Sequence, residues 1–130
     1  MKILLPSLMK CRRIYKLLKI FYESEKKNYY IDNKTSFNHA LILFCAFYNI
    51  SVPHVKFRRS FGHEKCVGMC MGNGNIQLLY PYNYRNSKRR GNGNVQSWIG
   101  IVYHELGHYY LWAKAEEKAM EFELKMMKRR

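Results

Sequence analysis

Acidic residues are scarce in this chain, and aspartate is almost absent. Asp32 is the only aspartate, and the nine acidic residues face 23 lysines and arginines, which gives a formal net charge of +14. Such an excess of positive charge favours negatively charged partners, namely nucleic acid or DNA-bound proteins, an anionic membrane surface, or an acidic protein substrate. It is equally typical of small basic proteins that bind none of these.

The chain also lacks a hydrophobic run long enough to cross a bilayer. Its longest apolar stretch, residues 40–48, is less than half of the roughly 20 residues that a membrane-spanning helix needs. The short apolar segment at the N-terminus is interrupted by Pro6 and followed by basic residues, unlike a cleavable signal peptide. We therefore expect a cytoplasmic (intracellular) protein in which residues 1–130 form a single domain. The oligomeric state is left open.

The four cysteines do not have the spacing of a metal-binding knuckle. Cys66 and Cys70 are four residues apart, and on a strand they would lie about 13 Å from one another, too far for a disulfide or a shared ion. A disulfide, or a second metal site with His63, would need a tight loop between them. Buried free thiols in a reducing compartment are the expected state.

One pattern carries specific chemistry, the sequence HELGH at residues 104–108. It lies in a proline-free, largely apolar segment, 95–112, which predicts a buried helix. Because residues four apart lie on the same face of a helix, His104 and His108 can each present a nitrogen to one Zn²⁺ ion. Glu105 lies about 100° round the helix, where it can reach a zinc-bound water as the general base. The alternative is a helix with two surface or hydrogen-bonded histidines.

A catalytic zinc site needs a third protein ligand, and no histidine follows the motif. The later carboxylates are therefore the candidates. On a continuous helix Glu116 would lie about 12 Å beyond the motif, so the chain must turn between about residues 111 and 115. A second helix then returns Glu116 or Glu117 to the histidines. The small and apolar residues that follow Glu116 favour this residue, and Glu117 is the alternative.

The motif, followed by EEKAMEF at residues 116–122, resembles the C-terminal part of gluzincin-type zinc metallopeptidases. The most similar groups are the ImmA/IrrE-like peptidases and the minimal gluzincins, in which a helix of the form ExEAxxFA follows HELGH. Glu116 matches the first glutamate of that pattern, whereas Lys118 and Glu123 depart from it. SprT-like peptidases are also similar, but their third metal ligand is a histidine, and in this chain no histidine follows the motif. The resemblance extends from Val52 onward, over about half of the chain.

The resemblance implies a zincin-like peptidase domain with Zn²⁺ as its cofactor. His104, His108 and Glu116 would hold the ion, and Glu105 would take a proton from water and pass it to the leaving amine. The substrate would be a protein or peptide. The alternative function is a basic nucleic-acid-binding protein with a structural or vestigial zinc site.

In such peptidases the substrate lies extended along the exposed edge of the sheet, pairing through its backbone. Here that edge would be the 76–80 strand or its neighbour. A tyrosine or histidine usually helps to stabilise the oxyanion. The candidates for this role are Tyr109, Tyr110 and Tyr80, and the sequence does not choose among them.

The rest of the chain predicts an α+β fold, with two N-terminal helices, a small three-stranded, mainly antiparallel sheet, the motif helix and a C-terminal glutamate helix. The first helix is amphipathic, and its basic side faces water or, as the sharper alternative, a nucleic-acid backbone or lipid headgroups. Thr35 or Ser36 is expected to cap the second helix. The expected elements are helices at 7–25, 37–49 and 95–112, strands at 55–58, 66–71 and 76–80, a hairpin turn at 72–75 and a polar loop at 82–94.

Overall fold

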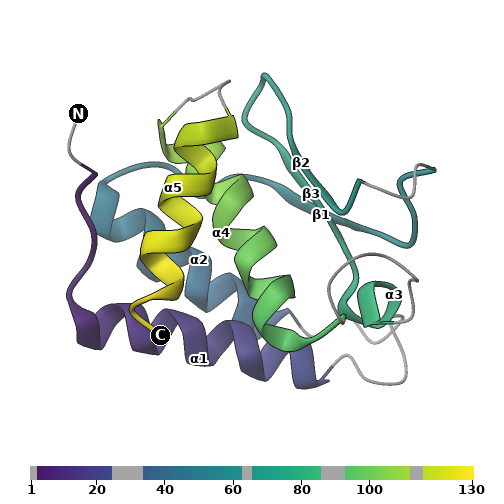
Figure 1. Ribbon diagram of the computed structural model, residues 1–130, viewed down its shortest axis with the longest axis horizontal. Helices are drawn as coiled ribbons and strands as arrows, with labels where there is room; N and C mark the ends of the chain where they lie inside the picture. Colours follow the sequence, from purple (N-terminus) through teal and green to yellow (C-terminus); the bar gives the residue numbers. More distant parts are fainter. Residues whose placement is uncertain (1–2, 25–33, 63–65, 86–92, 112–115) are drawn as a thin grey trace.

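The computed structural model describes residues 3–24, 34–62, 66–85, 93–111 and 116–130 (Figure 1). Its elements are α1 (Leu8–Ser24), α2 (Thr35–Tyr48), β1 (Val55–Arg58), β2 (Gly68–Cys70), β3 (Ile76–Leu79), α3 (Pro81–Arg85), α4 (Val95–Leu111) and α5 (Glu116–Met127). The α+β class is confirmed. None of the described helices has the length and hydrophobicity that crossing a bilayer requires.

The sheet is mixed rather than mainly antiparallel. Strands β2 and β3 form the expected antiparallel hairpin, but β1 pairs in parallel with β3, so the strand order is β1-β3-β2. The burial patterns explain this order. Three of the four residues of β3 are buried, which suits a central strand, whereas Lys56 and Arg58 of β1 are exposed, which suits an edge. The strand at 76–79 is therefore not an edge, and its neighbour β2 is.

Two local predictions were wrong, both at helix starts. Helix α2 begins at Thr35, and Lys34 before it makes no side-chain capping bond, so neither Thr35 nor Ser36 is the cap. The expected polar loop begins with a short helix, α3, whose first residue is Pro81. Proline is well suited to the first turn of a helix because its fixed φ is already helical and its missing N–H has no partner there. Residues 86–92 of that loop lie outside the described part.

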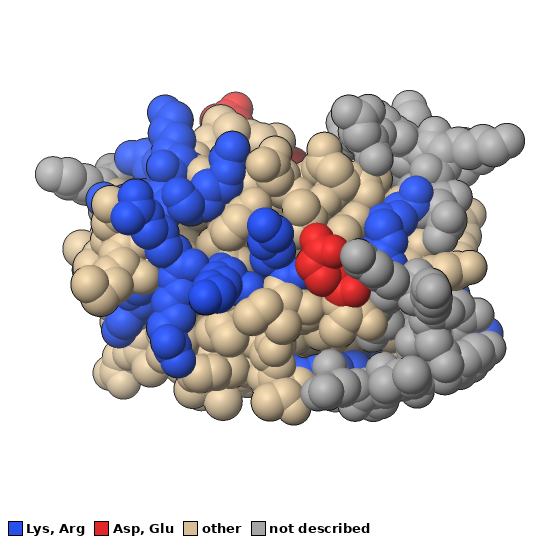
Figure 2. Space-filling view, turned by 90° about the horizontal axis from the view of Figure 1, so that it is seen from below, with Lys and Arg blue, Asp and Glu red and all other residues tan. Residues whose placement is uncertain are grey.

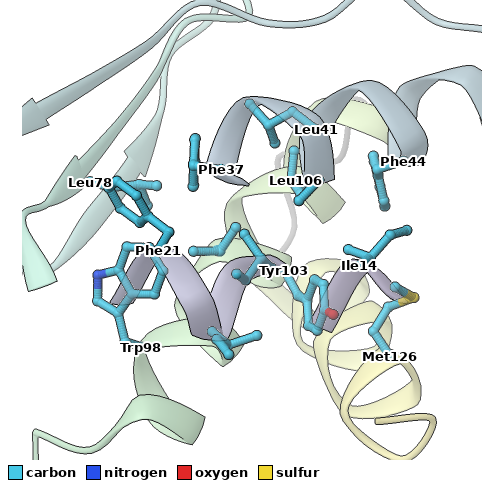
Figure 3. Close-up of a cluster of buried hydrophobic side chains, with 14 of the residues drawn as sticks. Ile14, Phe21, Phe37, Leu41, Phe44, Leu78, Trp98, Tyr103, Leu106 and Met126 are labelled. Atoms are coloured by element: carbon cyan, nitrogen blue, oxygen red, sulfur yellow. The ribbon is translucent and has the colours of Figure 1, made fainter. Parts of the chain in front are cut away.

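Large aromatic side chains fill the centre of the core, between α1, α2, β1 and α4 (Figure 3). The ring of Phe21 lies 5.2 Å from Phe37, 5.3 Å from Phe57 and 5.8 Å from Trp98. Burying each of these side chains stabilises the fold by roughly 1.5–3 kcal/mol. The indole N–H of Trp98 donates to the carbonyl of Leu79 over 3.1 Å, which fixes the start of α4 on the end of β3.

Helices α4 and α5 run antiparallel and pack side by side (Figure 1). Helix α4 starts near α1 and rises away from it, and α5 returns toward α1. The end of α4 and the start of α5 therefore lie on the side of the molecule opposite α1. This junction contains the HELGH motif and Glu116.

Candidate metal site

The two motif histidines lie one helical turn apart on α4, on the side that faces α5. Their ring centroids are 5.0 Å apart, and their side chains are only 12% and 15% exposed. The carboxylate of Glu116 meets both rings: one oxygen lies 3.0 Å from Nε2 of His104 and the other 2.9 Å from Nε2 of His108. The structure thus brings together three residues from two consecutive helices, α4 and α5.

These three residues could hold a metal ion. His104, His108 and Glu116 each offer one ligand atom, and all of these atoms lie within 4.8 Å of one another. Ligand atoms bound to one tetrahedral ion at 2.0–2.2 Å lie about 3.3 Å apart, so only small movements are needed. Glu117 does not belong to this group; its side chain points from another face of α5 and is exposed.

Glu116 reaches the histidines because α4 and α5 approach closely where their side chains are small. A Cβ atom on Gly107 would lie 3.1 Å from Cδ2 of Phe122 and 3.4 Å from the Cα atom of Ala119. Both Ala119 and Phe122 are fully buried in this contact. Glu116 stands one turn before Ala119, so the close contact carries its carboxylate over the motif. A glycine between the histidines is therefore part of the site's construction.

A second carboxylate bonds to the other side of His104. Oε1 of Glu123 lies 3.1 Å from Nδ1 of His104, and the side chain of Glu123 is 24% exposed. Gly100 provides the space, since a Cβ atom there would lie 2.8 Å from Oε2 of Glu123. The sequence contained a signal for this residue: Glu123 follows Glu116 by seven positions and so shares its face of α5. The gluzincin pattern does not identify this residue, because Glu123 departs from that pattern.

The hydrogen bonds of His104 determine its protonation in the absence of metal. Carboxylates only accept hydrogen bonds, so a ring bonded to Glu123 at one nitrogen and to Glu116 at the other carries a proton on both. Accordingly, the bond to Glu123 raises the pKa of His104 to about 9, with burial opposing and Glu116 adding to the rise. Burial would raise the pKa of Glu116, but the bonds from His108 and His104 outweigh it and lower that pKa.

Glu105 is the only charged residue in the described part of the chain that is buried, with 6% of its surface exposed. No hydrogen bond to its carboxylate is found among the described residues. Burial raises its pKa, while electrostatic interactions with His104 and His108 act in the opposite direction. Burying a carboxylate is costly, and carboxylates with a raised pKa are concentrated at functional sites.

Strand β2 forms the wall beside Glu105. A Cβ atom on Gly68 would lie 3.2 Å from both Cγ and Oε2 of Glu105 and 2.9 Å from a methyl group of Ile101. The backbone of β2 can therefore approach α4 this closely only because residue 68 has no side chain. Cys70, the next residue on this face, has its pKa raised to about 11 by burial and by the charge of Glu105.

The structure does not bring the three candidate tyrosines to the metal group. The hydroxyl of Tyr109 donates to the carbonyl of Ser51 over 2.6 Å, and the ring of Tyr110 packs on Tyr48 with centroids 3.9 Å apart. Tyr80 stacks on an aromatic ring of β1 at 5.5 Å. Within the described residues, no hydrogen bond joins these hydroxyls to the histidines or Glu116. Their role at the oxyanion stays a prediction.

The cysteines form no part of the site. All four carry free thiols, with Cys11 and Cys45 buried and Cys66 and Cys70 half-buried. His63, the remaining candidate for a second metal site, lies outside the described residues.

Comparisons of the chain with protein-family models, with curated proteins and with solved structures found no match. The resemblance to gluzincins therefore rests on the residues of the motif and of α5.

Proposed function

We propose that this protein is a zinc-dependent metallopeptidase of the gluzincin type. The observation that carries the proposal is the convergence of His104, His108 and Glu116, with their ligand atoms within 4.8 Å, beside the buried carboxylate of Glu105. Two imidazoles and one carboxylate form a ligand set that catalytic zinc sites use in proteins. Structural zinc sites have four protein ligands, and the described residues supply three, which favours a catalytic site.

Zinc held by these three residues would act as a Lewis acid, lowering the pKa of a water molecule and polarising a peptide carbonyl. Glu105 is the general base in this proposal. It accepts a proton as the water oxygen attacks the carbonyl carbon, and it returns the proton to the nitrogen as the C–N bond breaks. Its raised pKa suits both steps, because a carboxylate with a pKa nearer to neutral pH is better able to hold the proton between them.

Glu123 positions His104 in this proposal. By accepting a hydrogen bond from Nδ1–H it leaves Nε2 as the nitrogen that faces Glu116 and would bind the metal. Carboxylates in this role fix the tautomer and the ring orientation of metal-binding histidines. Gly100 supports the arrangement by leaving room for the carboxylate.

Strand β2 is the edge at which an extended substrate would pair in this proposal. One side of β2 is bonded to β3, and among the described strands nothing pairs with its other side. Gly68 holds this backbone against Glu105, so a peptide added to the edge would run close to the general base.

The test combines metal analysis with turnover in three variants. We expect one zinc per chain in the wild type and in Glu105→Gln, and none in Glu116→Gln. Glu117→Gln is the matched control, since it removes the same charge from the adjacent residue and should retain zinc. Hydrolysis of an unstructured protein such as casein should fall at least about 10²-fold in Glu105→Gln. Zinc retained in Glu116→Gln, or turnover retained in Glu105→Gln, would contradict the proposal.

A further inference from the structure

Helix α1 has a cationic side that the fold leaves in solvent. Its apolar side is buried in the core through residues such as Ile14, Leu18 and Phe21. The opposite side carries basic residues, all of them exposed, and we refer to this set as the α1 cationic face: Arg12, Arg13, Lys16 and Lys19. Figure 2, which looks at the molecule from the side on which α1 lies, shows Lys and Arg gathered over one half of the surface.

The charges of this face are not neutralised within the described part of the protein. No ion pair is found there for any of its four residues, and the only acidic residue of α1 is Glu23, near the end of the helix. The half-buried lysines of α5 differ: Lys118 and Lys125 approach Glu121 to 3.9 and 3.6 Å. The α1 cationic face therefore keeps its full charge for an external partner.

The chain terminus adds to this charge. The guanidinium of Arg129 donates to the carbonyl of Pro6 over 2.7 Å, which holds the end of the chain beside the start of α1. Lys128 and Arg130, on either side of Arg129, are exposed. Residues from both ends of the sequence thus contribute to one positively charged surface.

We propose that the α1 cationic face binds the sugar–phosphate backbone of duplex nucleic acid. Arg12, Lys16 and Lys19 form a line along the helix, with successive rises of about 6 and 4.5 Å. Phosphates along one DNA strand are spaced about 3.4 Å apart along the duplex axis, so a helix lying along the duplex would span about three phosphate steps with this line. Arg13 lies next to this line. Contacts of this kind hold the duplex without reading its sequence.

The composition of the face selects a duplex over other polyanions. Single strands are held by aromatic side chains on which bases stack, but Phe21 and Tyr22 are buried in the core and Tyr15 is half-buried. Interfacial helices insert their apolar side into lipid, whereas the apolar side of α1 is already used in the core. Leu8, Met9 and Ile20 are the exceptions, being exposed, and the test below includes lipid for that reason.

This inference goes beyond the proposed peptidase function and does not depend on it. Helix α1 lies opposite the junction of α4 and α5, so a duplex bound there leaves the metal group accessible (Figure 1). Binding should therefore be the same with zinc or with a chelator present, and the same in Glu105→Gln.

Fluorescence anisotropy of a labelled mixed-sequence DNA duplex tests the proposal. With four phosphate contacts, the logarithm of the binding constant should fall with the logarithm of salt concentration with a slope of about −3.6. The double variant Arg12→Gln/Lys16→Gln should bind the duplex at least roughly tenfold more weakly than the wild type. Its slope should be about −1.8. The charge-preserving variant Lys16→Arg/Lys19→Arg should bind like the wild type.

The matched control is Lys118→Gln/Lys125→Gln, which removes the same charge from α5 and should retain both affinity and slope. Arginine, lysine and glutamine have similar helix propensities, so circular dichroism and thermal midpoints should not change in either double variant. Equal weakening in the two double variants would overturn the proposal, because net charge alone would then explain binding. Tighter binding to phosphatidylserine vesicles or to single-stranded DNA than to the duplex would overturn it as well.

Discussion

The two sides of helix α4 are built in opposite ways. Toward α1, α2 and the sheet it presents large apolar residues that interlock with the core: Trp98, Ile99, Val102 and Leu106. Toward α5 it presents small and polar residues: Gly100, His104, Gly107 and His108. The first side is held by the volume of its side chains. The second depends on the absence of side chains at Gly100 and Gly107, which lets α5 and its carboxylates approach α4.

This difference predicts that stability and metal binding respond to different mutations. Apolar contacts in the core are numerous and shared, so truncating one side chain lowers the free energy of unfolding without redirecting any other group. On the α5 side each polar group has one or two partners, and each glycine accommodates one neighbour. A change there alters the geometry of the site more than the stability of the fold.

The largest effect on stability should come from the core side. Leu18→Ala removes a fully buried side chain of α1 and should lower the free energy of unfolding by about 2–5 kcal/mol. Zinc bound per folded chain should not change, because α1 makes no contact with the metal group. Urea denaturation and metal analysis of the folded fraction check the two parts separately. Loss of zinc from folded Leu18→Ala protein would remove the distinction between the two sides.

Gly107→Val should have the opposite profile. The added methyl groups collide with Phe122, which lies 3.1 Å from the position of a Cβ atom, so α5 must move and take Glu116 with it. Overpacking of this kind costs about 1–3 kcal/mol, and zinc affinity should fall sharply as well. Gly72→Val is the control, since a Cβ atom at Gly72 would meet nothing within 4 Å. Competition with a chelator of known affinity measures the change; unchanged affinity would show that Glu116 does not depend on this contact.

Glu123→Gln should weaken zinc binding by about 10–100-fold while changing stability little. Glu121→Gln, on the same helix but away from His104, should bind like the wild type. Gly100→Ala should reproduce part of the effect, because its methyl group takes the space of Oε2 of Glu123. Glu123→Gln replaces the charged hydrogen-bond partner of Nδ1 of His104 by a neutral one. The ¹⁵N chemical shift of this nitrogen should therefore change in NMR spectra of the imidazoles. Wild-type affinity in both variants would mean that the carboxylate does not position the ring.

The smallest effect should be a pH dependence of the metal-free protein. The pKa of His104 is about 9 in the folded state and near 6.5 in the unfolded state, so the folded state binds this proton more tightly. Its contribution to stability is complete below about pH 6.5 and is lost as the pH rises through about 9. The expected loss is of the order of 1 kcal/mol after solvent screening.

Thermal midpoints measured with a chelator between these pH values test this dependence, and His104→Gln should lack it. The buried thiol of Cys45, with a pKa raised to about 11, responds above this window and should not obscure it. A midpoint that rises over the same interval would have the wrong sign for a protonated His104.

Local patterns in the sequence were sufficient for the parts of the site that lie within one helix. The spacing of His104 and His108 placed them on one face of α4, and the absence of a later histidine directed attention to the carboxylates of α5. The choice between Glu116 and Glu117 was harder, since it depends on how closely two helices pack. The role of Glu123 depends on the same contact and was missed. Gly100 and Gly107, seven residues apart, were the signal of that contact.

The fold shows the same limit. Alternation of apolar and basic residues predicted the strand at 55–58, and the turn residues at 72–75 predicted the hairpin, but neither pattern revealed that β1 pairs in parallel with β3. That pairing joins segments far apart in the chain and is decided by which strand can be buried on both sides. After the strand at 76–80 the sequence predicts a polar loop, whereas the chain begins a helix at Pro81, whose fixed φ suits a first helical turn.

The glycines of α4 also affect how stable the two helices are without the rest of the fold. Each glycine lowers intrinsic helix stability by about 1 kcal/mol relative to alanine, and a helix as short as α5 is marginal by itself in water. A peptide of residues 95–127 should therefore be largely unfolded and a poor chelator, unlike a zinc finger, which folds around its ion. We therefore expect the scaffold to form before any metal binds, so that the metal could be removed without unfolding the chain.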